Sequence, residues 1–458
     1  MTCRGPSTGS GQASHVRPYE GRLAVMDDLL TRAVSKVIPA DLAKAKLESG
    51  KKLRVYLGID PTGSRLHLGH AVALRKLQAF ADADHHAIFL VGSFTATIGD
   101  PTGQDKMRDQ LSMEQIEENM KEYKSQASKI LDFSKVEIRY NNEWHGKLSS
   151  LHFVKITSHF TVQQMMQRDM FKERMKWKVV CTICKELSDS PVQFQSVEDK
   201  ENADFKETVI TCSHCGKKTK LSKDTIIPPP NPVSSLELLY PILQGYDSVE
   251  LDVDCEIGGN DQLFNMLCGR KLQKIYGKRE KFVLTTKLLE GTDGRKMSKT
   301  YDNCIYLTDS ANDMFGKLMS INDDLMETYF ECCTNVDLSE VKKIVKGNPR
   351  EAKARLAREI VALYHGADAG EKAEAAFTNV FTEKGIPEDI KEVKVKKGTL
   401  LVDVLVKEGL VSSKSEAKRL IEQKGIKMND VLVESMEEKV SEGVVRVGKR
   451  KFLKIYVL

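Results

Sequence analysis

The hydrophobic residues of the chain follow two different periods. Apolar runs at 53–60 and 87–91 are short and bounded by turn residues, which is typical of buried strands. The segment 67–80 between them repeats its apolar positions with helical spacing and predicts a helix. A strand, a turn, a helix and a second strand in this order predict a βαβ unit. We therefore expect a parallel sheet covered by helices.

The same periods predict the elements of the remaining chain. A third strand is expected at 136–140, and 398–458 should combine two short helices with strands in a small α+β module. The segment 310–380 is mostly amphipathic helix. Other helices are expected at 26–50, 113–133, 234–246, 400–408 and 415–423.

Changes in composition along the chain predict its domains. Polar alternation and two cysteine pairs interrupt the pattern at 176–223, and a proline-rich stretch at 228–232 closes this insertion. The first residues are rich in Gly, Ser and Thr and predict a disordered tail. The expected organisation is a tail at 1–25, a Rossmann-like α/β domain at 26–308 with the insertion at 176–223, a helical domain at 309–385, a linker at 386–397 and an α+β module at 398–458.

Charge is distributed unevenly. The chain carries 70 Lys and Arg against 65 Asp and Glu, a net charge of +5. Residues 396–458 hold 14 of the basic and 9 of the acidic residues, so this segment accounts for the whole excess. A basic module on a neutral body suggests a polyanionic partner, nucleic acid before membrane, while a solvated basic surface is the alternative. The sequence has no run of 18 apolar residues, which excludes a membrane-spanning helix.

The ten cysteines do not have the pattern of a disulfide framework in a chain of 458 residues. We therefore expect a reducing compartment, the cytoplasm. An organellar transit peptide is the alternative for the N-terminal tail, which contains arginines but has a poor apolar face.

Two histidines open the helix that follows the first predicted strand. His67 and His70 are three residues apart, so both project from one face of its first turn. A helix N-terminus attracts anions through its free N–H groups, and Gly69 lets a flat ligand approach the backbone. This corner suits a nucleoside triphosphate, although two surface histidines near a turn are common without one.

Two lysines form a second candidate site on a glycine-flanked loop. Lys296 and Lys299 lie in the sequence Lys-Met-Ser-Lys-Thr, shortly after Gly291-Thr-Asp-Gly294. Ammonium groups on such a loop can swing onto the charge that develops on a pyrophosphate. Taken alone, the same residues could form a solvated basic loop.

Together the two motifs resemble the signatures of a known family. His67-Leu-Gly-His70 resembles the HIGH signature, and Lys296-Met-Ser-Lys-Thr300 resembles the KMSKS signature, of class I aminoacyl-tRNA synthetases. They stand in the order of that family on a βα framework. Their joint occurrence is far more specific than either motif alone.

A third group of residues indicates which amino acid would be the substrate. Tyr240, Gln244 and Asp247 are spaced i, i+4 and i+7, which places a phenol, an amide and a carboxylate on one stripe of a predicted helix. The stripe resembles the Tyr-x-x-x-Gln-x-x-Asp helix of tyrosyl-tRNA synthetases, and the resemblance covers nearly the whole chain. Further matches to that family are Tyr56, Gly99-Asp-Pro-Thr-Gly103 and Gly258-Gly-Asn-Asp-Gln262.

The resemblance implies a tyrosine site. Asp247 and the hydroxyl of Tyr56 would bind the phenol of the substrate. Buried partners for a hydroxyl reject phenylalanine far better than an apolar pocket does, as the tyrosine enzymes themselves illustrate. The implied contacts to the α-ammonium group are Asp100, Tyr240, Gln244 and Gln262.

The resemblance also implies an ATP site. The implied catalytic residues at the phosphates are Thr62, His67, His70, Lys296 and Lys299, the two lysines stabilising the transition state and the leaving pyrophosphate. Other implied ATP contacts are Asp60, Gly69, Gly258 and, at the ribose, Asp261, with Lys299 again included. A general base is not required, because the tyrosine carboxylate is already ionised when it attacks the α-phosphate. Catalysis then rests on positioning and charge stabilisation, with Mg²⁺ expected on the pyrophosphate.

Two positions depart from the family pattern. Gln104 stands where many relatives carry a lysine after the Gly-Asp-Pro segment, and Lys106 and Arg108 could supply the mobile charge instead. Glu256 stands where a glutamine is common, so we assign it no substrate contact.

The insertion carries two Cys-x-x-Cys pairs separated by 27 residues. Four thiolates suit tetrahedral zinc in a ribbon-like hairpin, and Gly216 eases the tight turn after the second pair. The expected ligands are Cys181, Cys184, Cys212 and Cys215. His214 is a less favoured ligand, and four free buried thiols are the alternative. Because the pairs are remote in sequence from the signatures, we expect a structural zinc, and contact with the acceptor arm of tRNA or with a dimer partner is a hypothesis.

Residues 398–458 resemble an S4-type RNA-binding domain, notably at 413–421 and 425–429. Phosphate contacts are expected from Lys414, Lys418, Arg419, Lys424 and Lys427. Any one of these residues could instead belong to a solvated helix face. The module as a whole is the stronger prediction, because it holds the excess positive charge.

These features predict the activity of the tyrosyl-tRNA synthetases, with L-tyrosine, ATP and tRNA(Tyr) as partners. The resemblance, but not the composition, suggests a homodimer. Two alternatives stay open. A tryptophan-specific relative would share the fold but not need the phenol-directed Tyr56 and Asp247. A catalytically silent RNA-binding protein on the same scaffold would not need intact signature histidines and lysines.

Overall fold

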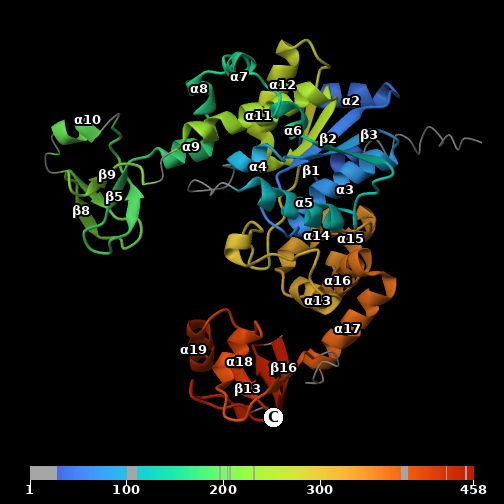
Figure 1. Cartoon of the computed structure of the whole chain (residues 1–458), viewed down its shortest axis with the longest axis vertical. Helices are drawn as coiled ribbons and strands as arrows, with labels where there is room; N and C mark the ends of the chain where they lie inside the picture. Colours follow the sequence, from blue (N-terminus) through green and yellow to red (C-terminus); the bar gives the residue numbers. More distant parts are fainter. Residues whose placement is uncertain are drawn as a thin grey trace, which may run out of the picture. The chain divides into compact units, whose positions relative to one another are not determined.

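The computed structural model describes most of the chain. The described residues are 28–100, 111–194, 197–203, 205, 208–230, 233–382, 390–429, 431–448 and 451–458. The expected tail at 1–25 and the expectations for Gln104, Lys106 and Arg108 lie outside them. The chain divides into two compact units (Figure 1). The first comprises Met1–Gly291, Arg295–Thr308 and Glu331–Cys333, and the second comprises Thr292–Gly294, Asp309–Phe330 and Thr334–Leu458.

A six-stranded sheet forms the core of the first unit, in the order β1-β11-β10-β2-β3-β4. Its strands are β1 (Val34–Ile38), β2 (Arg54–Ile59), β3 (His86–Val91), β4 (Val136–Tyr140), β10 (Cys255–Gly259) and β11 (Phe282–Thr286). All neighbours are parallel except β1, which runs antiparallel to β11. Every residue of β11 is buried, as in a parallel sheet covered on both faces. The predicted α/β fold is confirmed.

Helices cover this sheet and connect its strands. The longer ones in the first unit are α2 (Ala40–Glu48), α3 (Leu68–Asp82), α5 (Met113–Ala127), α11 (Ser235–Leu251) and α12 (Leu263–Ile275). Shorter ones are α4 (Thr95–Ile98), α6 (Asn142–His145), α7 (Ser150–Thr157), α8 (Val162–Met165) and α9 (Asp169–Arg174). Helix α11 begins at a capping box in which Ser234 and Glu237 satisfy each other's backbone N–H groups. This cap fixes the start of the helix that carries the predicted amino-acid stripe.

The prediction of one helix over 26–50 is wrong. The structure has strand β1 in the middle of this range, followed by α2. The β-branched residues Val34, Val37 and Ile38 favour the strand, which pairs with β11 at the edge of the sheet. Pro39 then separates the strand from the helix. The apolar spacing alone could not distinguish these two arrangements.

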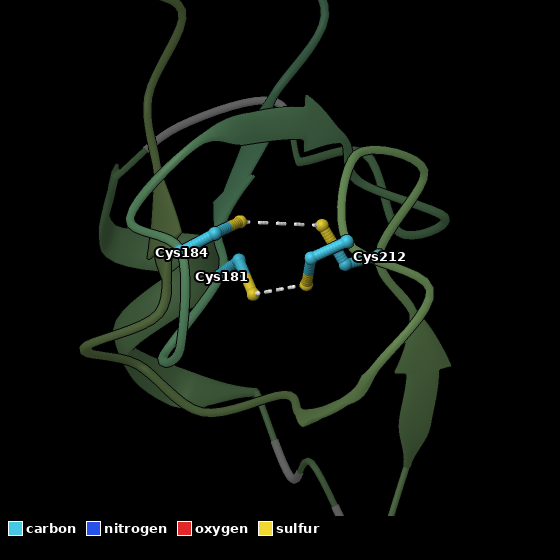
Figure 2. Close-up of side chains that lie close together, drawn as sticks. Cys181, Cys184 and Cys212 are labelled. Carbon is cyan, nitrogen blue, oxygen red and sulfur yellow. Dashed lines mark hydrogen bonds between the residues drawn. The ribbon is translucent and has the colours of Figure 1, made fainter.

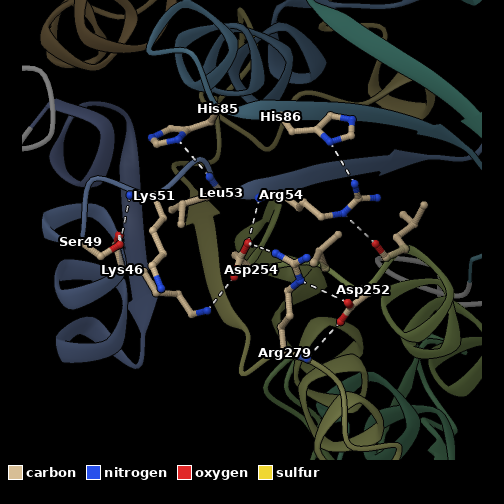
Figure 3. Close-up of polar contacts among 12 residues, drawn as sticks. Lys46, Ser49, Lys51, Leu53, Arg54, His85, His86, Asp252, Asp254 and Arg279 are labelled. Atoms are coloured by element: carbon tan, nitrogen blue, oxygen red, sulfur yellow. Dashed lines mark hydrogen bonds and ion pairs between the residues drawn. The ribbon is translucent and has the colours of Figure 1, made fainter.

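At the amino-terminal ends of the strands, Asp254 joins three segments (Figure 3). Its carboxylate accepts hydrogen bonds from Lys46 Nζ at 2.7 Å, from the backbone N–H of Arg54 at 2.9 Å and from Arg279 at 3.3 Å. Arg279 also bonds Asp252 at 3.2 Å. These contacts tie α2, β2 and the segment before β11 together.

The insertion forms two small sheets with their own apolar core. A three-stranded sheet has the order β6-β5-β9, and β7 and β8 form a separate pair. The elements are β5 (Lys178–Val180), β6 (Leu187–Asp189), α10 (Val197–Asn202), β7 (Val209–Thr211), β8 (Lys218–Lys220) and β9 (Ile226–Ile227). Buried residues of the core are Trp177, Val179, Leu221 and Ile226.

The second unit contains a helical part and a C-terminal module. The helices are α13 (Ala311–Leu318), α15 (Leu338–Val345), α16 (Pro349–His365) and α17 (Ala367–Thr382), while α14 (Met326–Cys333) belongs partly to each unit. The module has a five-stranded sheet in the order β12-β16-β15-β13-β14. Its elements are β12 (Glu392–Val395), α18 (Leu401–Lys407), α19 (Lys414–Glu422), β13 (Ile426–Met428), β14 (Val431–Leu432), β15 (Gly443–Val447) and β16 (Lys451–Val457). Strand β12 lies in the range expected to be a linker and pairs with β16, so the module begins earlier than 398.

Membrane-spanning segments are not found in the part of the chain that the structure describes, where every helix is too short or too polar to cross a bilayer.

Candidate active site and cysteine cluster

The two signature histidines form a buried pair at the start of α3. The backbone N–H of His67 donates to Nδ1 of His70 at 3.2 Å, and the ring centroids are 3.8 Å apart. Burial, together with the nearby lysines, lowers the pKa of His70 to about 4 and that of His67 to about 2. Both rings are therefore neutral at pH 7 and offer N–H groups rather than charge. A Cβ atom at Gly69 would lie 3.0 Å from the His67 ring, so glycine leaves that ring its space.

The lysine loop lies against this corner. Lys296 Nζ is 2.6 Å from a carboxylate oxygen of Asp261, the residue expected at the ribose. The ammonium group of Lys299 covers Gly63, where a Cβ atom would overlap it. Lys299 is thus adjacent to Thr62. The structure brings together the residues that the resemblance assigned to the triphosphate.

Asn303 holds the loop, and the sequence analysis did not identify it. Its side-chain oxygen accepts from the backbone N–H of Ser298 at 2.8 Å, and its amide donates to the carbonyl of Lys296 at 3.1 Å. The chain beyond the loop pairs with the histidine corner, with the N–H of Leu68 donating to the carbonyl of Ile305 at 2.9 Å. A single asparagine in a loop gives no sequence signal for such a role.

The first residue of the α11 stripe contacts the end of β2. The hydroxyl of Tyr240 donates to Asp60 at 2.8 Å, and Thr95 donates to the same carboxylate at 2.7 Å. Burial raises the pKa of Asp60 to about 7, partly offset by these two hydrogen bonds. The resemblance assigned Asp60 to ATP, and the structure joins it directly to the amino-acid helix.

Asp247, the last residue of the stripe, is buried among three nitrogen-bearing side chains. Trp144 Nε1 donates to it at 2.9 Å, His145 Nε2 lies 2.7 Å away, and the side-chain amide of Asn141 lies at 3.3 Å. The sequence analysis missed these three residues. One signal was available in the sequence: Trp144 is one of only two tryptophans in the chain and lies just after the strand predicted at 136–140.

Tyr56 lies in β2 with its side chain fully buried. Its hydroxyl is 3.0 Å from Ser248 Oγ, next to Asp247 on α11. Burial raises its pKa well above the ordinary value, and the carboxylates of Glu256 and Asp247 raise it further. Tyr56 therefore stays protonated and can donate a hydrogen bond.

The residues expected around the α-ammonium group form a chain of hydrogen bonds. Gln262 donates to Asp100 at 2.6 Å, and Asn265, which the sequence analysis missed, donates to Gln244 at 2.8 Å and to Gln262 at 3.1 Å. The buried Arg168 lies 3.6 Å from Asp100. This chain begins at the middle residue of the α11 stripe.

Two glycines at the end of β10 keep space for this site. A Cβ atom at Gly258 would lie 2.9 Å from the sulfur of Met266, and one at Gly259 would lie 2.5 Å from the carboxylate of Asp261. The site therefore lies at the carboxyl ends of parallel strands, where open α/β sheets bind their ligands.

The four cysteines of the insertion converge (Figure 2). The sulfur of Cys181 is 3.7 Å from that of Cys215, and the sulfur of Cys184 is 3.7 Å from that of Cys212. All four sulfur atoms lie within 4.8 Å of one another. His214 is not part of this cluster. Such an arrangement fits a closed tetrahedral metal site.

The two cysteine turns have the same geometry. Lys185 donates its backbone N–H to the carbonyl of Cys181 at 3.0 Å, and Gly216 donates to the carbonyl of Cys212 at 2.9 Å. Both following residues have positive φ, 66° at Lys185 and 68° at Gly216. The predicted turn at Gly216 is confirmed, and the first turn reaches the same conformation with a lysine.

The basic residues of the C-terminal module lie on its surface. Lys414, Lys418 and Arg419 are exposed on α19, whose inner face buries Ala417 and Ile421. Lys414 also forms an ion pair with Asp403 at 2.6 Å. The two other candidates are the exposed Lys424 in the following turn and the half-buried Lys427 in β13.

Comparison with known proteins agrees with this geometry. The family model for tRNA synthetases class I (W and Y) matches residues 48–184 and 205–382, and a model for the tyrosine–tRNA ligase SYY-like C-terminal domain matches residues 382–455. The tyrosine–tRNA ligase of Bordetella pertussis is 40% identical over 438 residues, covering 94% of this chain and 93% of the relative. That of Thermotoga maritima is 38% identical over 437 residues, covering 93% and 96%.

Solved structures show the same fold. Tyrosyl-tRNA synthetase from Archaeoglobus fulgidus, complexed with L-tyrosine, matches with a TM-score of 0.54 and 18% identity, covering 77% of this chain and 99% of that one. Tryptophanyl-tRNA synthetase from Plasmodium falciparum matches with a TM-score of 0.50 and 14% identity, covering 78% and 89%. At these identities the likeness concerns the fold alone.

Proposed function

The chain belongs to the class I tRNA synthetases of the tryptophan and tyrosine group, and we propose that it joins L-tyrosine to tRNA(Tyr). One observation carries this proposal. Asn265 bonds both Gln244 of the α11 stripe and Gln262, and Asp261, the neighbour of Gln262, pairs with Lys296 of the lysine loop, so the stripe and the loop meet at the carboxyl end of one sheet. The curated relatives that match nearly the whole chain carry the same activity in their names.

The first step is adenylation. A carboxylate oxygen of tyrosine attacks the α-phosphorus of ATP, and the bond to the pyrophosphate oxygen breaks. The neutral rings of His67 and His70 would donate N–H groups to the phosphates. Lys296 and Lys299 would supply positive charge to the transition state and to the departing pyrophosphate. In the second step a hydroxyl of the 3′-terminal ribose of tRNA takes the tyrosyl group, and AMP leaves.

Tyrosine recognition would use both ends of the substrate. Asp247 would accept the phenol proton, and Tyr56 would donate to the phenol oxygen. Phenylalanine would leave these buried groups unpaired, which is the physical basis of the discrimination. The α-ammonium group would bind among the hydrogen-bonded residues around Gln244, namely Asp100, Gln262, Tyr240 and Asp60.

Mg²⁺ would arrive with ATP. The side chains at the phosphate corner are imidazoles, a hydroxyl and ammonium groups, whereas Mg²⁺ prefers carboxylates and phosphate oxygens. The pyrophosphate oxygens are therefore its expected ligands, and when bound it would neutralise part of their charge.

Zinc would bind the four-cysteine cluster as a structural ion. Four sulfur ligands leave no open position for a substrate, and metal binding would join the two turns of the insertion. Exchange of Cys212 and Cys215 for Ser should remove one equivalent of zinc, measured by atomic emission. Full metal content in that variant would refute this site.

The C-terminal module would bind the tRNA through its exposed basic helix. Deletion of residues 390–458 should weaken tRNA binding while leaving adenylation intact. Unchanged tRNA affinity would contradict this role.

A homodimer is supported by exposed apolar side chains on and near α7. Leu151 is 81% exposed, Val154 59% and Val162 64%. Exposed apolar side chains are a feature of many protein interfaces.

The cytoplasm is the compartment we propose, because tRNA and ATP meet there during protein synthesis.

Amino-acid-dependent ATP–pyrophosphate exchange is the experiment that tests the function. Tyr, Trp and Phe should be compared in parallel on the purified protein. Exchange with Tyr alone is the expected result. Exchange with Trp would keep the fold and overturn the pocket assignment, and folded protein without any exchange would favour a silent RNA-binding protein.

A further inference from the structure

A buried ion pair lies behind the tyrosine pocket. The ammonium group of Lys281, just before β11, contacts the carboxylate of Glu256 in β10, and both side chains are at most 2% exposed. Lys281 also donates to Ser248 Oγ of α11 at 2.7 Å. Replacing such a pair by apolar residues is often neutral or stabilising, so stability alone is a weak explanation for its presence.

The pair is connected to both ends of the proposed tyrosine site. Ser248 Oγ is 3.0 Å from the hydroxyl of Tyr56, at the phenol end. The other oxygen of Glu256 accepts from the side-chain amide of Gln244 at 3.3 Å, at the ammonium end. Lys281 itself lies 6.0 Å from the centre of the Tyr56 ring. A single buried cation therefore orders two residues assigned to the substrate.

The direction of the Ser248–Tyr56 hydrogen bond decides what Tyr56 can do. A hydroxyl has one proton to donate and two lone pairs that accept. If Tyr56 donates to Ser248 or to the nearby Glu256, its proton is not available to a substrate. If Ser248 donates to Tyr56, the proton of Tyr56 is free to point into the pocket.

Lys281 favours the second arrangement. It donates to Ser248 and to Glu256, and so takes one acceptor position on each of the two groups that compete for the Tyr56 proton. Ser248, which accepts from Lys281, has a single proton to donate. The Tyr56 oxygen is its closer partner at 3.0 Å, because the Glu256 oxygen is 3.3 Å away and already bonded to Lys281. Tyr56 keeps its own proton, since burial raises its pKa well above neutrality.

We propose that Lys281 is a positioning residue for tyrosine recognition, which directs the hydroxyl of Tyr56 as a donor to the phenol oxygen of the substrate. The proposal rests on the function proposed above. It assigns the choice between tyrosine and phenylalanine partly to a residue that touches neither amino acid.

The test replaces the pair by apolar residues. The variant Lys281→Met/Glu256→Leu removes both charges and leaves Ser248 free to accept from Tyr56. In ATP–pyrophosphate exchange we expect the kcat/KM ratio of tyrosine to phenylalanine to fall at least tenfold. The fall should come through the KM for tyrosine, with the KM for ATP within twofold of the unsubstituted protein. An unchanged ratio in folded protein would overturn the proposal.

The chain offers a matched control on the same helix. Arg174 and Glu237 form another buried pair, 2.6 Å apart with side chains at most 5% exposed, at the other end of α11. The variant Arg174→Met/Glu237→Gln removes both charges but keeps a side-chain oxygen for the capping box of α11, so it should leave the ratio within twofold. An equal fall in this control would show a general effect of lost buried charge and would overturn the role of Lys281.

The Ser248→Ala variant tests the direction of the hydrogen bond and avoids a large change in the core. It removes a competing acceptor while Lys281 still occupies Glu256, so the ratio should stay within threefold of the unsubstituted protein. A tenfold fall of the ratio in this variant would show that the Ser248 hydroxyl is itself required to hold Tyr56 in place. That result would overturn the proposal. Absence of tyrosine-dependent exchange in the unsubstituted protein would instead refute the proposed function itself.

Discussion

The two ends of the central sheet use buried carboxylates in different ways. At the amino end, Asp254 faces the charged groups of Lys46 and Arg279 (Figure 3). At the carboxyl end, Asp247 contacts the side chains of Trp144, His145 and Asn141. The Asp254 and Asp247 side chains are similarly buried, 7% and 4% exposed. Burial alone therefore does not distinguish the two residues.

The partners do distinguish them. Asp254 has its charge balanced by ion pairs and its oxygens occupied by three segments, so its contribution is to hold those segments together. Asp247 is fixed in place by hydrogen bonds from the side chains of Trp144 and Asn141 and by its contact with the ring of His145. A carboxylate has about four acceptor positions, so Asp247 keeps capacity for a substrate hydroxyl. The amino end is built for stability and the carboxyl end for binding.

The largest expected effect concerns the loop lysines at the carboxyl end. Lys296→Ala/Lys299→Ala should lower the rate of pyrophosphate exchange at least about 1000-fold, because each preorganised charge on a transition state contributes about 100-fold or more. The thermal midpoint should hardly change, since the Lys296–Asp261 pair is exposed and exposed ion pairs contribute at most about 1 kcal/mol. Lys51→Ala/Lys52→Ala at the amino end is the matched control and should keep full activity. A similar rate loss in that control would contradict the assignment of stability to the amino end of the sheet and of binding to the carboxyl end.

The two aspartates give the most direct comparison. Asp247→Asn should lower kcat/KM for tyrosine about 100-fold, which is about 3 kcal/mol, because it removes the acceptor for the phenol proton. Asp254→Asn should lower the free energy of unfolding by about 2 kcal/mol, since it leaves Lys46 without its charge partner. Its kcat/KM should stay within threefold. Steady-state exchange and urea unfolding on both variants measure this, and the reverse pattern would refute it.

The pH dependence of the unfolding free energy should show the raised pKa of Asp60, which lies at the carboxyl end of the sheet. Its pKa is raised to about 7 by burial, so between pH 4 and 7 the folded chain keeps a proton that the unfolded chain has lost. Stability should therefore fall as pH rises through this window, by up to about 1.4 kcal/mol per pH unit from this residue. Asp60→Asn removes this contribution.

The difference in unfolding free energy between Asp60→Asn and the unsubstituted protein should grow from pH 4 to pH 7 and then level off. The signature histidines act in the opposite direction, because their lowered pKa values make stability rise between about pH 4 and 6.5. They are present in both proteins, so their effect cancels in the difference. A difference independent of pH would show that Asp60 titrates normally.

Sequence analysis identified the parts of the site whose pattern is local. The histidine corner, the lysine loop and the α11 stripe each lie within a few residues, so each could be compared directly with the signatures of the family that it resembles. The four cysteines were found for the same reason, and the structure brings their sulfur atoms together.

Other parts could not be found in this way. Trp144, Asn265 and Lys281 act on residues from other elements, and only the folded sheet brings them together. Strand β1 was missed because its apolar positions also fit a helix, and the choice depends on pairing with β11, which follows about 250 residues later in the chain.

The smallest expected effect is the difference in stability contributed by the two charged partners of Asp254, Lys46 and Arg279. Arg279 is 44% exposed and Lys46 is 20% exposed, so water and salt screen the arginine more strongly. Arg279→Gln should cost less than about 1 kcal/mol of unfolding free energy, and most of this should vanish in 1 M NaCl. Lys46→Gln should cost more and retain more of its effect at high salt, with adenylation unchanged in both. Equal losses of unfolding free energy in the two variants would mean that the burial of a contact at the amino end does not determine its contribution to stability. The Asp254→Asn variant would then be the remaining evidence that this end of the sheet serves stability.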